Sequence, residues 1–130
     1  MRYLSYSDGP TWMPFPLRAS TACALDLDHL RRMTLDDQAL ERDVLRMFLT
    51  QAGRLVEALA ERPAEAGTLA HTLKGSARAI GALGVAEAAA AVENASRKSG
   101  DLAGPLGMLS DALAEARGAI QARLASPDLA

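Results

Sequence analysis

The sequence predicts an all-α protein: an antiparallel four-helix bundle with a short extra N-terminal helix and an extended N-terminal arm. Four stretches repeat apolar residues at steps of three and four, the spacing of one face of an α-helix. Short loops join these stretches, and none alternates apolar and polar residues as a half-buried strand does. The 130 residues, 49% of them hydrophobic, suffice for one domain with one core.

The chain divides into an arm or linker over residues 1–22, the bundle over 23–126 and a tail over 127–130. The arm contains Gly9 and three prolines and has no helical period. It holds four of the five aromatic residues of the chain, Tyr3, Tyr6, Trp12 and Phe15. Three interpretations stay open: the arm folds back over the bundle, docks a partner, or is a linker from a larger hybrid kinase.

The first two helices are predicted from their caps. Asp26 is the expected N-cap of a short lid helix that ends at Met33. Thr34 and Asp37 fit a capping box that opens a long helix reaching Glu61. The apolar edge of the lid helix consists of Leu27, Leu30 and Met33. The apolar stripe of the long helix consists of Leu40, Val44, Phe48, Ala52, Leu55 and Leu59. Charged residues of the long helix, such as Glu41, are expected to face solvent.

The next three helices follow from proline, glycine and apolar spacing. Pro63 ends the long helix, and a helix is predicted over 64–82 with Gly81 in the turn that follows. A helix over 85–98 then ends at Gly100 as C-cap. The last helix has the clearest period, with apolar residues at Leu102, Leu106, Leu109, Leu113, Ala116, Ile120 and Leu124.

The helix over 64–82 has two chemically different faces. Leu69, Leu73, Ala77 and Ile80 form an apolar stripe, and His71 lies about 200° from Leu69 around the axis. Lys74, Gly75 and Arg78 follow His71 by three, four and seven residues and share its solvent face. Glycine inside a helix costs about 1 kcal/mol relative to alanine, which indicates that space is needed there.

A neutral imidazole carries a nitrogen lone pair and can act as a nucleophile at neutral pH. The pattern therefore points to transient phosphorylation of His71. The alternative is an ordinary solvated helix face. His29 lacks a following Lys-Gly pair and is interpreted as a surface histidine.

The run Ala70-His71-Thr72-Leu73-Lys74-Gly75-Ser76-Ala77, followed by Ile80-Gly81-Ala82, resembles the phospho-acceptor helix of histidine-containing phosphotransfer (HPt) domains. The likeness extends more loosely from about Leu25 to Leu124. It implies that His71 carries the phosphoryl group, that Lys74 stabilises its charge, and that Gly75 makes room for a partner receiver domain.

The resemblance also implies a docking surface around the acceptor helix. Arg78 would attract the acidic pocket of a receiver domain towards His71 by long-range electrostatics. The rim of this docking surface is expected to consist of small, uncharged residues, Ala64, Gly67, Thr68, Ala79 and Ala82. Glu93 resembles a recurrent glutamate of the family. The alternative is an ordinary pair with Arg97, four residues later on the same helix.

We therefore expect a phosphotransfer protein that relays a phosphoryl group between aspartates of receiver domains, those of a hybrid sensor kinase and a response regulator, in a bacterial phosphorelay. The chain shows no Gly-rich phosphate loop and no paired Asp ligands, so we expect no ATP binding and no cofactor, with Mg²⁺ held by the receiver. The alternative is a scaffold or inhibitor that binds a receiver or kinase without being phosphorylated.

Composition argues against other classes of partner. A net charge of −2 and a pI near 5.6 do not favour nucleic acid. No apolar run approaches the roughly 18 residues of a membrane span and no signal peptide is evident, so we expect a cytoplasmic monomer. Two histidines and the single Cys23 are too few for a metal centre.

Overall fold

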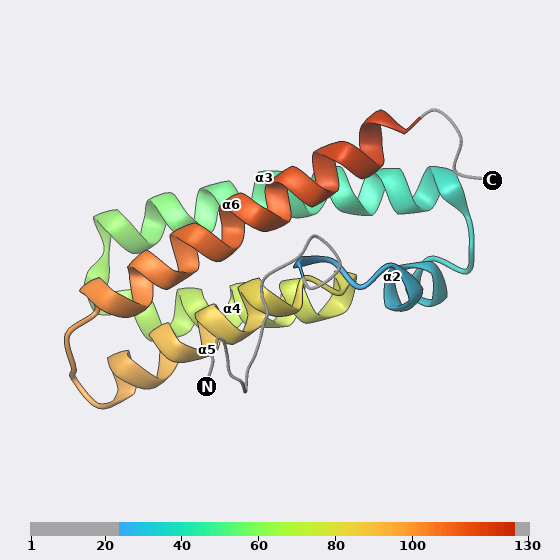
Figure 1. Ribbon diagram of the computed structural model, residues 1–130. Coiled ribbons are helices and arrows are strands. Elements are labelled where there is room, and N and C mark those ends of the chain that lie inside the picture. Colours follow the sequence, from blue (N-terminus) through green and yellow to red (C-terminus); the bar gives the residue numbers. More distant parts are fainter. Residues whose placement is uncertain (1–23, 127–130) are drawn as a thin grey trace, which may run out of the picture.

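The computed structural model describes residues 24–126, and five α-helices account for most of this part of the chain (Figure 1). They are α2 (Leu27–Met33), α3 (Gln38–Glu61), α4 (Ala66–Ile80), α5 (Leu83–Arg97) and α6 (Ala103–Ala125), with a 3₁₀ turn, η1 (Pro63–Glu65), before α4. Residues 24–126 contain no strand. The predicted all-α bundle with a short additional helix is confirmed. The predicted arm and tail lie outside the described residues.

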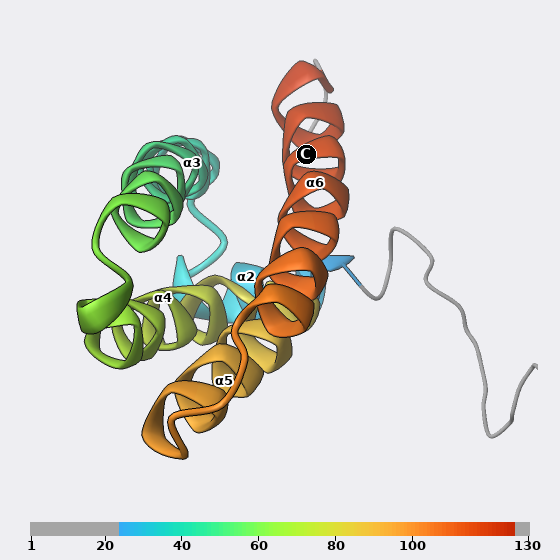
Figure 2. The same cartoon turned by 90° about the vertical axis from the view of Figure 1, so that its left-hand side faces the viewer.

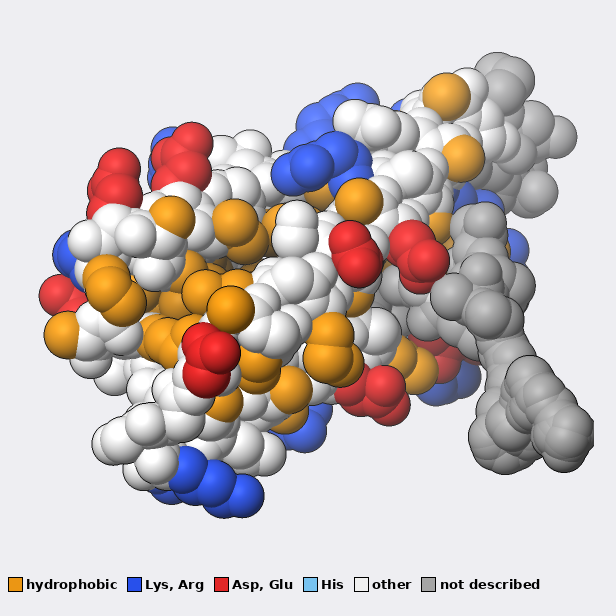
Figure 3. Space-filling view, turned by 60° about the vertical axis from the view of Figure 1, so that its left-hand side comes forward, with side chains coloured by type: hydrophobic (Ala, Val, Ile, Leu, Met, Phe, Trp, Pro, Cys, Tyr) orange, Lys and Arg blue, Asp and Glu red, His pale blue; other side chains and the backbone are white. Residues whose placement is uncertain are grey.

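Helices α3 to α6 form the bundle (Figure 2), and α2 lies at the C-terminal end of α4, where the Asp26 N–H bonds to the Gly81 carbonyl. In sequence order α3 packs on α4, α4 on α5, and α5 on α6. Hydrophobic side chains gather towards one end of the face shown in Figure 3, with charged side chains around them. Helix α4, which carries His71, thus has a neighbour on each side, α3 and α5.

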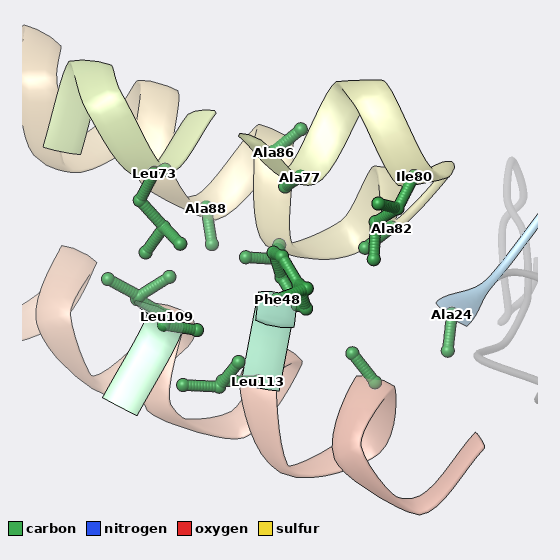
Figure 4. Close-up of a cluster of buried hydrophobic side chains, with 14 of the residues drawn as sticks. Ala24, Phe48, Leu73, Ala77, Ile80, Ala82, Ala86, Ala88, Leu109 and Leu113 are labelled. Carbon is green, nitrogen blue, oxygen red and sulfur yellow. The ribbon is translucent and has the colours of Figure 1, made fainter. Parts of the chain in front are cut away.

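The core fills the space between the four helices. Phe48 of α3, Leu73 and Ile80 of α4, and Leu109 and Leu113 of α6 point towards one another (Figure 4), and each is at most 4% exposed. The predicted apolar stripes of α4 and α6 are buried in their central parts, whereas Leu69, Leu102, Leu106 and Leu124 are only partly buried. Fully or almost fully buried alanines lie on both α4 and α5, among them Ala66, Ala70, Ala77, Ala88 and Ala89. Small side chains allow these two helices to lie close together.

The capping box predicted at Thr34 and Asp37 is wrong. Helix α3 begins at Gln38, and the carboxylate of Asp37 caps it by accepting a hydrogen bond from the Leu40 N–H at 3.1 Å. Thr34 instead closes α2, because its buried hydroxyl donates to the Leu30 carbonyl at 2.8 Å. Asp26 is the N-cap of α2, as predicted, but Met33 is 54% exposed and lies off the apolar edge.

The expectation that Glu41 faces solvent is also wrong. Glu41 is 3% exposed, and its carboxylate accepts hydrogen bonds from the Arg123 guanidinium of α6 at 2.7 and 3.2 Å. The next residue, Arg42, donates to the carbonyls of Leu124 and Ser126 at 2.7 and 2.8 Å. Two adjacent residues of α3 thus fasten the C-terminal end of α6 to the bundle.

The helix termini near the site differ by a few residues from their predicted positions. Helix α4 begins at Ala66, since residues 63–65 form η1. It ends at Ile80, two residues before the predicted bound. Gly81 lies in the turn, as predicted, and is the C-cap: its φ is 85° and a Cβ would lie 2.8 Å from the Asp26 carbonyl oxygen. Helix α5 begins at Leu83, and its left-handed end residue is Ser99, with φ 55°, instead of Gly100.

Candidate functional site

The exposed face of α4 carries the predicted site residues. The His71 side chain is 68% exposed, and Gly75 and Arg78 are also exposed one and two turns further along. Lys74 lies on the flank that faces α5, and only 18% of its side chain is exposed. The helix therefore presents an accessible imidazole beside a half-buried ammonium group.

Glu93 of α5 links these two groups. Its Oε2 lies 2.9 Å from His71 Nδ1, and its Oε1 accepts a hydrogen bond from Lys74 Nζ at 2.6 Å. The Arg97 guanidinium is more distant, 3.4 Å from Oε2. Glu93 forms the predicted ion pair with Arg97, but its shorter contacts are with His71 and Lys74 of α4. Periodicity cannot reveal a partner 22 residues away, so the family resemblance was the only signal in the sequence.

The position of the imidazole proton follows from the charge of Glu93. The hydrogen bond from Lys74, opposed by desolvation and assisted by the hydrogen bond from His71, lowers the pKa of Glu93 from 4.5 to about 2. At neutral pH this side chain is a carboxylate and can only accept hydrogen bonds. Nδ1 of His71 therefore carries the proton that it shares with Glu93. In the neutral imidazole the lone pair is on Nε2, and Nε2 is the nucleophilic atom.

A cleft of about 350 Å³ opens beside the imidazole between α4 and α5. It is lined by Gly67, Thr68, His71, Thr72, Glu93, Ser96 and Arg97. Gly67 has a packing role here, because a Cβ at this position would lie 3.2 Å from the Ser96 hydroxyl oxygen.

The structure separates the predicted rim residues. Gly67 and Thr68 lie in the cleft next to His71, and Ala79 is exposed on α4. Ala82 is fully buried, so the prediction that it contacts a partner is wrong. Its backbone N–H bonds to the Ala77 carbonyl at 2.8 Å to close α4, and this turn points its side chain into the core (Figure 4).

A Cβ at Gly75 would find no atom within 4 Å, so the chain's own packing does not require glycine there. The same is true of Gly53 and Gly118, which also lie in helices. Open space is therefore not peculiar to Gly75. Its distinguishing feature is its place one turn from His71.

His29 is half-buried and has a structural role. Its Nε2 lies 3.1 Å from the Ala79 carbonyl oxygen, which ties α2 to the end of α4. No carboxylate bonds to this ring within residues 24–126.

Comparison with known families agrees with this arrangement. A family model described as the Hpt domain matches residues 43–125, which include His71, Lys74, Gly75 and Glu93. The chain belongs to the Hpt domain family. Hpt domains perform histidine phosphotransfer in two-component phosphorelays and interact there with receiver or kinase domains. No curated protein matches the chain closely enough to count as a relative.

Residues 24–126 contain no group of three or more His, Cys, Asp or Glu side chains placed to hold a metal ion. None of the helices described is both long and apolar enough to cross a membrane.

Proposed function

We propose that this Hpt domain relays a phosphoryl group between the aspartates of two receiver domains, one of a hybrid sensor kinase and one of a response regulator, through a phosphohistidine at Nε2 of His71. The observation that carries the proposal is the 2.9 Å contact between His71 Nδ1 and the Glu93 carboxylate. It supports a ring whose proton is on Nδ1 and whose free nitrogen is Nε2.

In the forward step, the Nε2 lone pair attacks the phosphorus of an aspartyl phosphate on the donor receiver. The N–P bond forms, the P–O bond breaks, and its electron pair leaves on the aspartate carboxylate. The ring then carries a positive charge, which the nearby Glu93 carboxylate stabilises. In the return step an aspartate of the acceptor receiver attacks the same phosphorus, and the imidazole leaves neutral.

Two cations assist this exchange. Lys74 fixes the Glu93 carboxylate through the 2.6 Å hydrogen bond and adds positive charge close to the phosphoryl oxygens. Arg78, exposed and two turns from His71, attracts the acidic pocket of the incoming receiver. Mg²⁺ belongs to the receiver in this scheme, and the bundle supplies a rigid support for the imidazole.

The test is to incubate the 130-residue chain with receiver domains labelled on aspartate, in the presence of Mg²⁺. We expect label on the wild type and none on His71→Gln, with an adduct that is stable in alkali and labile in acid. His29→Gln is the matched control and should accept label normally.

Label retained by His71→Gln would refute the assignment. Tight receiver binding without any transfer would favour the alternative, a scaffold or inhibitor in which His71 is only a docking residue.

A further inference from the structure

We propose that Glu93 makes the lability of the phosphoryl group on His71 nearly independent of pH in the folded protein, because its carboxylate holds the proton on Nδ1 of the phosphorylated ring. This inference rests on the proposed function, since it concerns the phosphohistidine of the same relay. It makes Glu93 a positioning residue for the departure of the phosphoryl group as well as for its arrival. The geometry that carries it is the 2.9 Å contact between Glu93 Oε2 and His71 Nδ1.

The charge of the phosphorylated ring decides how easily its N–P bond breaks. When Nε2 carries the phosphoryl group and Nδ1 keeps its proton, the ring is an imidazolium and leaves as a neutral imidazole. Without that proton the ring would leave as an anion, which is a far poorer leaving group. A ring without a partner loses the proton near neutrality, where imidazoles titrate. A phosphohistidine in an unfolded chain is for this reason labile in acid and stable in alkali.

In the folded protein the surroundings of Nδ1 favour the protonated ring. The hydrogen bond from Lys74 lowers the pKa of Glu93 to about 2, so Glu93 is a carboxylate at every pH at which the domain works. A carboxylate accepts hydrogen bonds and cannot donate one. It therefore pairs with Nδ1 only while Nδ1 carries a proton. Phosphorylation at Nε2 leaves this side of the ring free to keep the contact, and the negative charge stabilises the imidazolium.

The other charged groups around the ring cannot replace Glu93. The ionisable side chains that line the cleft besides His71 are Glu93 and Arg97, both of α5, and no residue of α2, α3 or η1 lines it. Arg97 is 3.4 Å from Oε2 and 66% exposed. On α4, Lys74 bonds to Oε1 and Arg78 is exposed two turns away. These cations weaken the effect of the carboxylate, but in the described part of the chain Glu93 is the one acidic group bonded to the ring.

Removal of the carboxylate should have opposite effects in acid and in alkali. In acid the phosphorylated ring is protonated with or without Glu93. The carboxylate then stabilises a charge that disappears as the phosphoryl group leaves, so the wild type should lose the group more slowly than Glu93→Ala. Above neutrality the variant loses its Nδ1 proton and the wild type keeps it, so the wild type should lose the group faster. The two pH profiles should cross.

The experiment phosphorylates the 130-residue chain with phosphoramidate, a small phosphoryl donor that needs no docking, and follows the loss of the phosphoryl group to water. Water attacks the phosphorus, the N–P bond breaks, and its electron pair returns to Nε2, which gives inorganic phosphate and a neutral imidazole. ³¹P NMR at a series of pH values measures the rate after the reagent is removed. Longer incubation compensates for slower labelling of a variant, His71→Gln gives the background, and circular dichroism verifies folding.

At about pH 5 the wild type should lose the group about two to five times more slowly than Glu93→Ala, the range of an exposed ion pair. At about pH 9 it should lose the group about ten times faster, the lower end of the effect of a neighbouring opposite charge, because the ring is largely exposed. Glu93→Gln should be the slowest at about pH 9, since its amide can donate to an unprotonated Nδ1. The matched control Glu87→Ala removes an exposed carboxylate of the same helix and should follow the wild type.

Parallel profiles of the wild type and Glu93→Ala would overturn the inference, because a merely structural effect changes both ends of the profile in the same direction. A wild-type phosphorus resonance that shifts through neutrality as in Glu93→Ala would overturn it too, since it would show that the proton is lost. Neither result depends on a receiver. Absence of transfer from every receiver to the wild type would refute the proposed function itself, and the loss of the phosphoryl group to water would still be measurable.

Discussion

Substitutions at Gly75 and Gly118 can distinguish an effect on the stability of the protein from an effect on partner docking. Both lie inside helices, in α4 and α6, and a Cβ at either position meets no atom within 4 Å. Each Gly→Ala change should therefore stabilise the protein by about 1 kcal/mol, the difference in helix propensity. For a domain of this size that corresponds to a rise in Tm of about 4 °C. The two glycines share no neighbour, so the double variant should gain about 2 kcal/mol.

Glutamate substitutions at the same two glycines should have different effects on the rate of phosphotransfer. Gly75→Glu places a side chain and a negative charge one turn from the acceptor imidazole, where a receiver must approach. We expect transfer to slow at least tenfold, whereas Gly118→Glu should transfer like the wild type. Urea unfolding followed by circular dichroism gives the stabilities, and label uptake from a phosphorylated receiver gives the rates.

Equal rates for Gly75→Glu and Gly118→Glu would refute the claim that the space above His71 serves docking. A Gly75→Ala protein that is less stable than the wild type would refute the claim that the position is open within the chain.

Three further predictions concern the carboxylates. Glu93→Gln should slow label uptake at least tenfold, because an amide can donate to Nδ1 and leave the proton on Nε2, whereas Arg97→Gln should stay within about twofold. The Glu93 carboxyl group should titrate in NMR spectra with a pKa of about 2. The ionised Glu93 side chain therefore contributes fully to the free energy of unfolding above pH 4.5, and this contribution is lost as the pH falls through 2. Lys74→Met should raise the pKa of Glu93. Glu41→Gln should cost about 3 kcal/mol in urea unfolding, since it leaves a half-buried guanidinium uncompensated, whereas the exposed Asp43→Asn should cost almost nothing.

Periodicity predicted the part of this fold that depends on burial. Leu109, Leu113, Ala116 and Ile120 of α6 are all at most 4% exposed, as their spacing requires. The spacing of His71 from Leu69 and Leu73 likewise predicted an exposed imidazole. These predictions succeed because the apolar face of a helix and its opposite face are fixed by 3.6 residues per turn, whatever the helix packs against.

The errors arise where a side chain has a choice of partner. Thr34 can cap the helix that follows or close the one that precedes it, and the sequence pattern is the same in both cases. Glu41 and Glu93 each have basic residues nearby in sequence, yet their shortest bonds are to Arg123, 82 residues away, and to Lys74. Local charge rules cannot predict such contacts because they describe one helix at a time.

The small residues of α4 and α5 connect the packing of this bundle to its chemistry. The Glu93 carboxylate can accept the Nδ1 proton of His71 at 2.9 Å only if its own helix lies close to the acceptor helix. A close approach of the two helices is seen at Gly67 of α4, where a Cβ would lie only 3.2 Å from the Ser96 hydroxyl oxygen of α5. Ala70 and Ala77 on α4 and Ala89 on α5 are fully buried, and side chains of this size permit close helix packing. Because the imidazole and the carboxylate are both attached to regular helices, their separation is held more firmly than loops would hold it. The tautomer that leaves Nε2 free is thus a consequence of small residues in the core as much as of the polar residues on the surface.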